Sequence, residues 1–284
     1  KTLKWPLNPK KIITGNSYDF DELFKIWTAQ KVISGSKFLI FQHGSLIGNH
    51  ISHEENNEFK VCDNFFCWGK KNINKKKITM FNFKVLNKKI KKNKKFKLLV
   101  ICKNQGCENE VYDRVYEHSK IVDGLEQLVK KLPSNILLQT YFRLRLKNKY
   151  NFEKDFLEKE NLKIINVQKN IFEYTTRSRL VVFLYNSTGI LENLTLNIPT
   201  VCYWPDVENS RNDMDSNYIN LLKKSEILFD NPIDLTKHII DKFDNVELWW
   251  NNKNLQKNRI KLCEEYSIIP SKNSLKNLAQ EIKI

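Results

Sequence analysis

No run of 18 apolar residues occurs in the 284-residue sequence, and no segment is rich in glycine or proline. The first absence excludes a hydrophobic membrane-spanning helix, and the second leaves no flexible linker by which to divide the chain. The sequence starts without an initiator Met, and its first apolar stretch is broken by Pro6 and Pro9. We therefore expect no signal peptide, and we expect that an upstream piece of the protein is not included.

Metal-binding motifs are also lacking. The six cysteines show no C-x2-C spacing, the histidines form no H-E-x-x-H motif, and the D-x-D pair at Asp213 and Asp215 lies in a polar stretch that we expect to open a helix. We therefore expect neither a metal nor a cofactor. The cysteines lie in or beside apolar segments, as small buried reduced thiols do.

Positive charge is abundant, with a net charge of +16, and much of it lies in Lys70–Lys77 and Lys88–Lys97. These lysines are interleaved with Asn rather than with aromatic residues or Arg, so the stacking and forked hydrogen bonds of base recognition are missing. We interpret them as a solvated connection that can also contact anionic phospholipid or a polyanionic substrate. Nucleic-acid binding is the disfavoured alternative.

The hydrophobic content of 41% and aromatic content of 12% predict substantial cores, in two domains of ordinary size or one large α/β domain. Strand patterns alternate with helical patterns, which predicts parallel β-α-β units. The expected strands are 10–14, 37–41, 61–68, 78–83, 96–102, 135–140, 162–166, 180–184, 200–204 and 227–229. We place the domain boundary near Lys84 to Lys95.

The stretch Phe183–Trp204 is the segment around which we interpret the rest of the chain. It reads as a strand, a polar turn, a helix and a second strand. A turn that follows a strand and opens a helix binds anions well, because unpaired N–H groups and the helix dipole point into it. Ser187 and Thr188 are placed to hold a phosphate, and Glu192, one helical turn further on, to accept hydrogen bonds from sugar hydroxyls. The alternative is that Ser187 only caps the helix.

A second junction of this kind follows the expected strand at 37–41. There Gln42, His43 and Gly44 come directly after the apolar residues. Gly44 allows the backbone to approach a ligand. His43 can act as a base, as an acid or as a hydrogen bond donor to phosphate near neutral pH. The alternative is a histidine that only satisfies a loop carbonyl.

The order of these motifs resembles a known family. The motifs are Gln42-His-Gly44, Asp63–Gly69, Arg143, Ser178–Val182, Asn186–Glu192, Asn197–Thr200 and Trp249-Trp250. The series resembles the transferases of bacterial O-antigen and other surface-polysaccharide gene clusters. More loosely it is similar to two-domain GT-B glycosyltransferases, including Kdo transferases, and to CDP-glycerol glycerophosphotransferases.

The resemblance implies an α/β protein with two Rossmann-like domains and parallel sheets. Residues 1–90 would be the C-terminal part of a first, acceptor-side domain, incomplete in this chain. Residues 91–284 would be a second, nucleotide-donor-binding domain with the C-terminal helices. Gly189 departs from the bulkier residue that relatives often carry there, without removing the phosphate contacts.

The resemblance also implies roles for individual residues. His43, from the first domain, would be the catalytic base or acid. Arginine and the helix dipole would replace the charge of a metal ion. The implied donor-binding residues are Gln42, Gly44, Arg143, Arg179, Asn186, Ser187, Thr188 and Glu192.

The implied activity is transfer of a sugar from a nucleotide-activated donor to a growing surface polysaccharide. The implied partners are the nucleotide-sugar donor and a glycan or lipid-linked acceptor, and the implied location is the cytoplasm or the inner face of the cell membrane. Two alternatives stay open: a CDP-polyol phosphotransferase using the same histidine and turn, and a nucleotide-sugar-binding subunit without catalysis.

Overall fold

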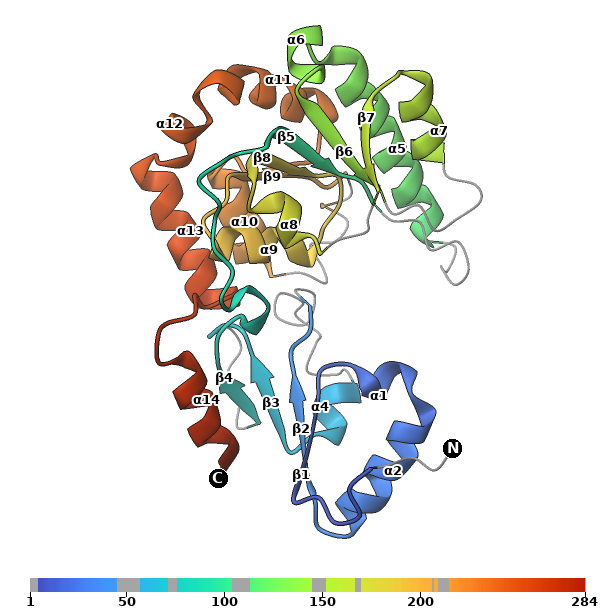
Figure 1. The fold of residues 1–284 in the computed structure, drawn as a ribbon, viewed down its shortest axis with the longest axis vertical. Helices are drawn as coiled ribbons and strands as arrows, with labels where there is room; N and C mark the ends of the chain where they lie inside the picture. Colours follow the sequence, from blue (N-terminus) through green and yellow to red (C-terminus); the bar gives the residue numbers. More distant parts are fainter. Residues whose placement is uncertain are drawn as a thin grey trace. The chain divides into compact units, whose positions relative to one another are not determined.

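The computed structural model describes residues 5–44, 57–70, 76–103, 113–144, 152–166, 170–205, 207–208 and 215–283. The chain forms two compact units (Figure 1). Unit 1 comprises Lys1–Phe83 and Glu264–Ile284, and unit 2 comprises Lys84–Cys263. The last 21 residues, which we assigned to the second domain from the sequence, thus pack with unit 1.

Unit 1 contains a sheet of four parallel strands in the order β1-β2-β3-β4. Short helices connect the strands, and one helix comes from the chain's C-terminal segment. The elements are β1 (Lys11–Thr14), α1 (Ser17–Phe20), α2 (Glu22–Ile33), β2 (Lys37–Phe41), α4 (Asn57–Val61), β3 (Asn64–Cys67), β4 (Lys77–Thr79) and α14 (Ser274–Lys283).

Local sequence explains these boundaries. Asp21 caps the start of α2 by accepting a hydrogen bond from the Phe24 amide, and Gly35, with φ of 98°, ends the turn that follows the helix. Phe38 and Ile40 of β2 alternate into the core of the unit. The Ile268 amide donates to the Trp68 carbonyl, the Ile268 carbonyl accepts from the Asn82 amide, and the Ser267 hydroxyl accepts from the Asn82 side chain. These bonds hold the C-terminal segment to this unit.

Unit 2 contains a sheet of six parallel strands in the order β10-β9-β8-β5-β6-β7. Its strands are β5 (Phe96–Ile101), β6 (Thr140–Leu144), β7 (Lys163–Asn166), β8 (Ser178–Phe183), β9 (Thr200–Tyr203) and β10 (Leu228–Phe229). Its helices are η2 (Phe83–Val85), α5 (Asp113–Lys131), α6 (Ser134–Leu137), α7 (Phe152–Lys159), α8 (Phe172–Thr175), α9 (Thr188–Thr195), α10 (Ser216–Lys224), α11 (Pro232–Lys242), η4 (Phe243–Asn245), α12 (Val246–Trp250) and α13 (Lys253–Tyr266). The first residue of η2 and the C-terminal end of α13, from Glu264 on, belong to unit 1.

The strand order of unit 2 is that of a Rossmann sheet. Counted from β5, the chain first adds β6 and β7 on one side and then β8, β9 and β10 on the other. The direction of winding reverses between β5 and β8, and in open sheets of this kind ligands bind outside the carboxyl ends of the strands at that reversal. The predicted α/β class with two parallel sheets is confirmed.

Three expected strands are wrong in their bounds. The strand expected at 78–83 is β4, which ends at Thr79, and Phe83 begins the 3-10 helix η2. The apolar run at 135–140 begins as helix α6, because Pro133 suits a first helical turn and its carbonyl accepts hydrogen bonds from Ile136 and Leu137. The strand β6 starts only at Thr140, which places Arg143 inside it. Likewise Val61 ends helix α4, and β3 starts at Asn64.

Three further expectations concern a membrane-spanning helix, the cysteines and Asp215. Within the described ranges, no helix is long and apolar enough to cross a bilayer. The described cysteines, Cys62, Cys67, Cys102, Cys202 and Cys263, are buried, as predicted, and form no disulfide among the described residues. Asp215 caps the start of α10, so it opens a helix as expected. Residues 45–56, 71–75, 104–112 and 209–214 lie outside the described residues, together with the expectations that fall on them.

Candidate functional site

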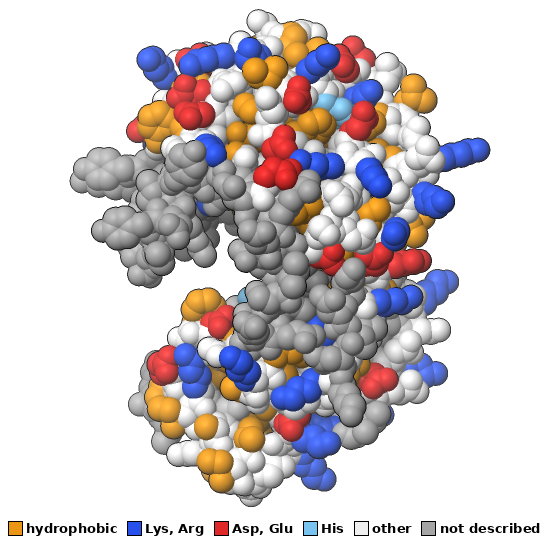
Figure 2. Space-filling view, turned by 180° about the vertical axis from the view of Figure 1, so that it is seen from behind, with side chains coloured by type: hydrophobic (Ala, Val, Ile, Leu, Met, Phe, Trp, Pro, Cys, Tyr) orange, Lys and Arg blue, Asp and Glu red, His pale blue; other side chains and the backbone are white. Residues whose placement is uncertain are grey.

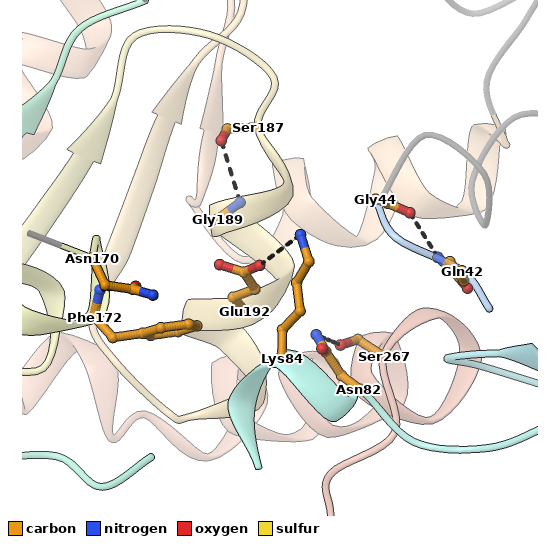
Figure 3. Close-up of polar contacts among 10 residues, drawn as sticks. All are labelled: Gln42, Gly44, Asn82, Lys84, Asn170, Phe172, Ser187, Gly189, Glu192 and Ser267. Atoms are coloured by element: carbon orange, nitrogen blue, oxygen red, sulfur yellow. Dashed lines mark hydrogen bonds and ion pairs between the residues drawn. The ribbon is translucent and has the colours of Figure 1, made fainter. Parts of the chain in front are cut away.

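The turn between β8 and α9 lies at the reversal point of the unit 2 sheet. Strand β8 ends at Phe183, and Ser187 caps α9 by accepting a hydrogen bond from the Gly189 amide at 3.2 Å (Figure 3). Ser187 therefore caps α9, as the alternative interpretation of this residue predicted. A phosphate contact at the same helix N-terminus is compatible with it, because the cap satisfies one of the amides of the first turn.

Gly189 is required for this turn to pack. A Cβ atom at this position would lie 2.7 Å from the ring of Phe183, closer than side chains approach one another. The first turn of α9 therefore lies directly against the last residue of β8. This contact gives a physical reason for the glycine.

Asn186 contributes a polar group that is not satisfied within the described chain. Its Oδ1 is buried and has no hydrogen bond partner there. A buried polar atom without a partner costs about 1 to 3 kcal/mol. Rotation of the amide by 180° would present N–H donors at the same place. A ligand hydroxyl at the start of α9 would satisfy Oδ1 by donating to it, and a phosphate oxygen would accept from the N–H groups of the rotated amide.

Arg143 reaches the same edge of the sheet from β6. Arg143 and Phe183 are both in register with Ile101 of β5, so they lie at one level, about 10 Å apart across two strand spacings. The guanidinium of Arg143 lies 5.4 Å from the centre of the Tyr174 ring. Its positive charge also acts on Tyr185, which follows β8 closely.

Tyr185 is a residue that the sequence analysis missed. Burial raises the pKa of Tyr185, whereas its hydrogen bond with the Ser187 hydroxyl and the charge of Arg143 oppose this rise. The phenol therefore bonds to the capping serine and lies within the electrostatic influence of Arg143. Its position directly after the apolar run of β8 was the available signal.

Glu192 is deeply buried on α9, with 7% of its side chain exposed. Its Oε1 lies 3.6 Å from Nζ of Lys84, and in Figure 3 the two side chains point toward one another. Burial raises the pKa of Glu192, and the charge of Lys84 opposes the rise. Its expected role as acceptor for sugar hydroxyls stays a prediction.

Arg179 lies at the opposite edge of the sheet. It is the second residue of β8, about 13 Å of strand before Phe183. Its guanidinium forms a forked pair with Glu247, at 2.9 and 3.0 Å, and donates to the Asp244 carbonyl at 2.6 Å. Arg179 therefore does not belong with the donor-binding residues that we expected from the sequence. The Ser187 turn lies beyond its reach, and its N–H groups bond to Glu247 and to the Asp244 carbonyl.

The histidine turn belongs to unit 1. Gln42 is fully buried, its Oε1 accepts from the Trp68 amide at 2.7 Å, and its Nε2 donates to the Gly44 carbonyl at 2.9 Å (Figure 3). This places Gln42 as the residue that shapes the turn rather than as a ligand contact. His43 is half-buried, and its Nδ1 has no hydrogen bond partner among the described residues. Among the described residues, no loop carbonyl is bonded to Nδ1.

Solved structures with similar folds are distant in sequence. The wall teichoic acid polymerase TagF, in a structure soaked with CDPG, matches with a TM-score of 0.52 and 12% identity over 88% of this chain and 67% of that chain. A Listeria monocytogenes structure assigned as a UDP-N-acetylglucosamine 2-epimerase matches with a TM-score of 0.55 and 11% identity over 96% of this chain and 72% of that chain. No curated protein matches the sequence significantly.

These likenesses and the two parallel sheets define the GT-B fold, with two Rossmann-like units. Within that class, residues 1–282 match the model of the LIC12162 family transferases. The chain belongs to this family. It is therefore a member of a transferase family, as the resemblance implied.

Proposed function

We propose that this protein is a glycosyltransferase that moves a sugar from a nucleotide-activated donor to a growing surface polysaccharide. The observation that carries the proposal is the position of the Ser187 turn at the winding reversal of the unit 2 sheet. There an anion meets a helix N-terminus, the unsatisfied Asn186 amide and the charge of Arg143. Transfer from a nucleotide donor needs such groups around the phosphate, because negative charge grows on the leaving phosphate.

In this proposal Ser187, Thr188 and Asn186 bind the donor phosphates, and Arg143 neutralises their charge through forked hydrogen bonds. Glu192 accepts hydrogen bonds from donor hydroxyls. Gly44 lets the backbone after β2 approach the substrate, and His43 is the general base or acid. Arg143 and the dipole of α9 replace a metal ion, so we propose that the activity is metal-independent.

A thermal-shift screen tests the donor class. We expect one or more of CMP, CDP, UDP, GDP and their sugar conjugates to raise Tm, because a ligand that binds only the folded state stabilises it. EDTA should not change the shift. If none of these nucleotides stabilises the protein at millimolar concentration, the proposed donor site is contradicted.

One observation favours a second candidate, a CDP-polyol phosphotransferase. The TagF structure, whose fold this chain shares, was soaked with CDPG. The Ser187 turn would suit the diphosphate of such a donor as well, and His43 would take the same role. Release of CMP from CDP-glycerol would favour this reaction, whereas release of a nucleoside diphosphate from a nucleotide sugar would favour the glycosyltransferase.

We further propose that the lysines of Lys88–Lys97 contact anionic membrane surface near a lipid-linked acceptor. Most of them are exposed, but three also hold the segment in place. Lys88 and Lys95 lie over the rings of Phe172 and Phe96, and Lys94 donates to a backbone carbonyl. On the face in Figure 2, by contrast, basic side chains are dispersed among acidic ones.

Vesicle binding tests this contact. Lys91 and Lys92 are exposed, as are Lys253 and Lys257 on α13. Retention on phosphatidylglycerol vesicles should fall with added salt and with the double change Lys91→Gln and Lys92→Gln. The matched change Lys253→Gln and Lys257→Gln should reduce it less. Equal retention on neutral vesicles, or no retention on either, would leave these lysines as a solvated connection.

A further inference from the structure

A groove of about 560 Å³ lies on unit 2, remote from the Ser187 turn. Its lining includes Glu226, which precedes β10, Trp249 of α12, and Asn254 at the start of α13. Glu226 marks the amino ends of the parallel strands, whereas Ser187 follows their carboxyl ends. The length of strand β8, about 17 Å, separates the amino ends of the strands from their carboxyl ends.

The wall of the groove is fixed to the sheet by Arg179. This residue begins β8 and binds Glu247 and the Asp244 carbonyl, which flank the groove residue Asn245. The pKa of Glu247 is lowered, chiefly by the hydrogen bond from Arg179. A structural role for Arg179 thus replaces the phosphate-binding role that we expected from the sequence.

A buried aromatic pair lies at the groove and beneath it. Trp249 lines it and is 8% exposed, and its Nε1 has no hydrogen bond partner among the described residues. His238 packs against Trp249 with ring centres 4.9 Å apart, is also 8% exposed, and its Nε2 is likewise without a partner in the described chain. Both nitrogens are buried and His238 does not line the groove, so a ligand would meet the exposed part of the Trp249 side chain rather than these atoms.

The rim supplies hydrogen-bonding groups of several kinds. Glu226 and Asp241 are exposed carboxylates, Asn245 and Asn254 are exposed carboxamides, and Leu248 adds an exposed apolar side chain. Carboxylates and carboxamides pair with hydroxyl groups as acceptors and donors. Lys224 and Lys242 also line the groove, so two ammonium groups balance the two carboxylates and the lining favours a ligand without net charge. The polar rim disfavours a purely apolar ligand.

We propose that this groove binds a neutral oligosaccharide, with hydroxyls on the polar rim and a sugar face near Trp249. Concave sites with apolar floors and a few placed polar groups are the usual form of a small-ligand site. The proposal does not depend on the donor site. It gives the protein a second contact with glycan, at the other edge of the sheet.

Saturation-transfer NMR on the full chain, with chitotetraose and maltotetraose as probes, tests the groove. We expect at least one probe to bind, and we expect Asp241→Ala combined with Asn254→Ala to weaken that binding at least tenfold. The matched pair Asp234→Ala and Asn277→Ala, also exposed, should bind as the parent does. The single change Asn254→Ala serves if the double variant does not fold.

Two results would overturn the proposal. One is binding of neither tetrasaccharide, and the other is equal binding by the groove variant and the matched pair. The groove variant should keep the parent's affinity for nucleotide. Failure of the groove is therefore distinguishable from failure of the donor site.

Discussion

The ammonium of Lys84 lies 3.6 Å from the buried carboxylate of Glu192, so the first lysine after unit 1 is joined to helix α9. Burial nonetheless raises the pKa of Glu192 above its ordinary 4.5. The ionised carboxylate therefore costs the folded state free energy at neutral pH. Below about pH 4.5 both the folded and the unfolded state are protonated, and the cost vanishes.

We predict that Glu192→Gln raises Tm at pH 7, with a gain that shrinks as the pH falls toward 4.5. Gln keeps the shape of the side chain and removes the buried charge. Glu173→Gln is the control, because Glu173 is half exposed and its contact with Arg177, at 4.0 Å, is a surface pair. A lower Tm for Glu192→Gln at pH 7 would mean that Lys84 outweighs the burial cost.

Gly189→Ala should destabilise the protein by about 1 to 3 kcal/mol, the usual cost of overpacking. The added methyl would meet the Phe183 ring at 2.7 Å, whereas Gly15→Ala would make only ordinary contacts at 3.8 Å and should be nearly neutral. Denaturant unfolding measures both. Recovery of stability in Gly189→Ala with Phe183→Leu would confirm the cause, and equal effects of the two alanines would contradict it.

His238 should make stability fall as the medium is acidified. Burial lowers its pKa from 6.5 to about 4. The unfolded chain therefore takes up a proton first, and stability is lost between about pH 6.5 and pH 4, by about 3 kcal/mol in all. His238→Phe fits the neighbouring Phe229 and Trp249 rings and should flatten this part of the profile. The same slope in parent and variant would rule His238 out as the cause.

His43→Ala should lower kcat by about 10²- to 10⁴-fold and leave nucleotide affinity nearly intact. His43 belongs to unit 1, whereas the proposed nucleotide site belongs to unit 2. Steady-state release of nucleotide from the best donor, compared with calorimetric affinity, separates the two effects. Turnover at the parent rate would return His43 to a structural role in its loop.

Much of unit 2 could be predicted from the sequence, because strong local signals mark its elements. Ser187 caps the start of α9, and Pro199 directly precedes the strand that follows it. The order of the strands could not be predicted, since pairing between β5 and β8 joins segments about 80 residues apart. That order, rather than the turn itself, places Ser187 at the reversal point.

The two arginines show the same limit. In sequence, Arg143 follows the apolar run at 135–140, whereas Arg179 directly precedes the run at 180–184. The register places Arg143 beside the last residue of β5 and Arg179 at the first residues of β8. Tertiary pairing, which local pattern does not encode, decides which arginine can meet a phosphate.

The central claim is that nucleotide phosphate binds where β8 turns into α9, within reach of Arg143. Calorimetric titration with the nucleotide that most raises Tm tests it in the parent, Arg143→Ala, Thr188→Val and the control Arg177→Ala. Loss of a charge-assisted hydrogen bond should weaken binding to Arg143→Ala by about 1.5 to 3 kcal/mol, which is about 10- to 150-fold. Thr188→Val should also bind more weakly, and Arg177→Ala, at the other end of β8, should bind as the parent does. Parent affinity in folded Arg143→Ala and Thr188→Val would contradict the claim.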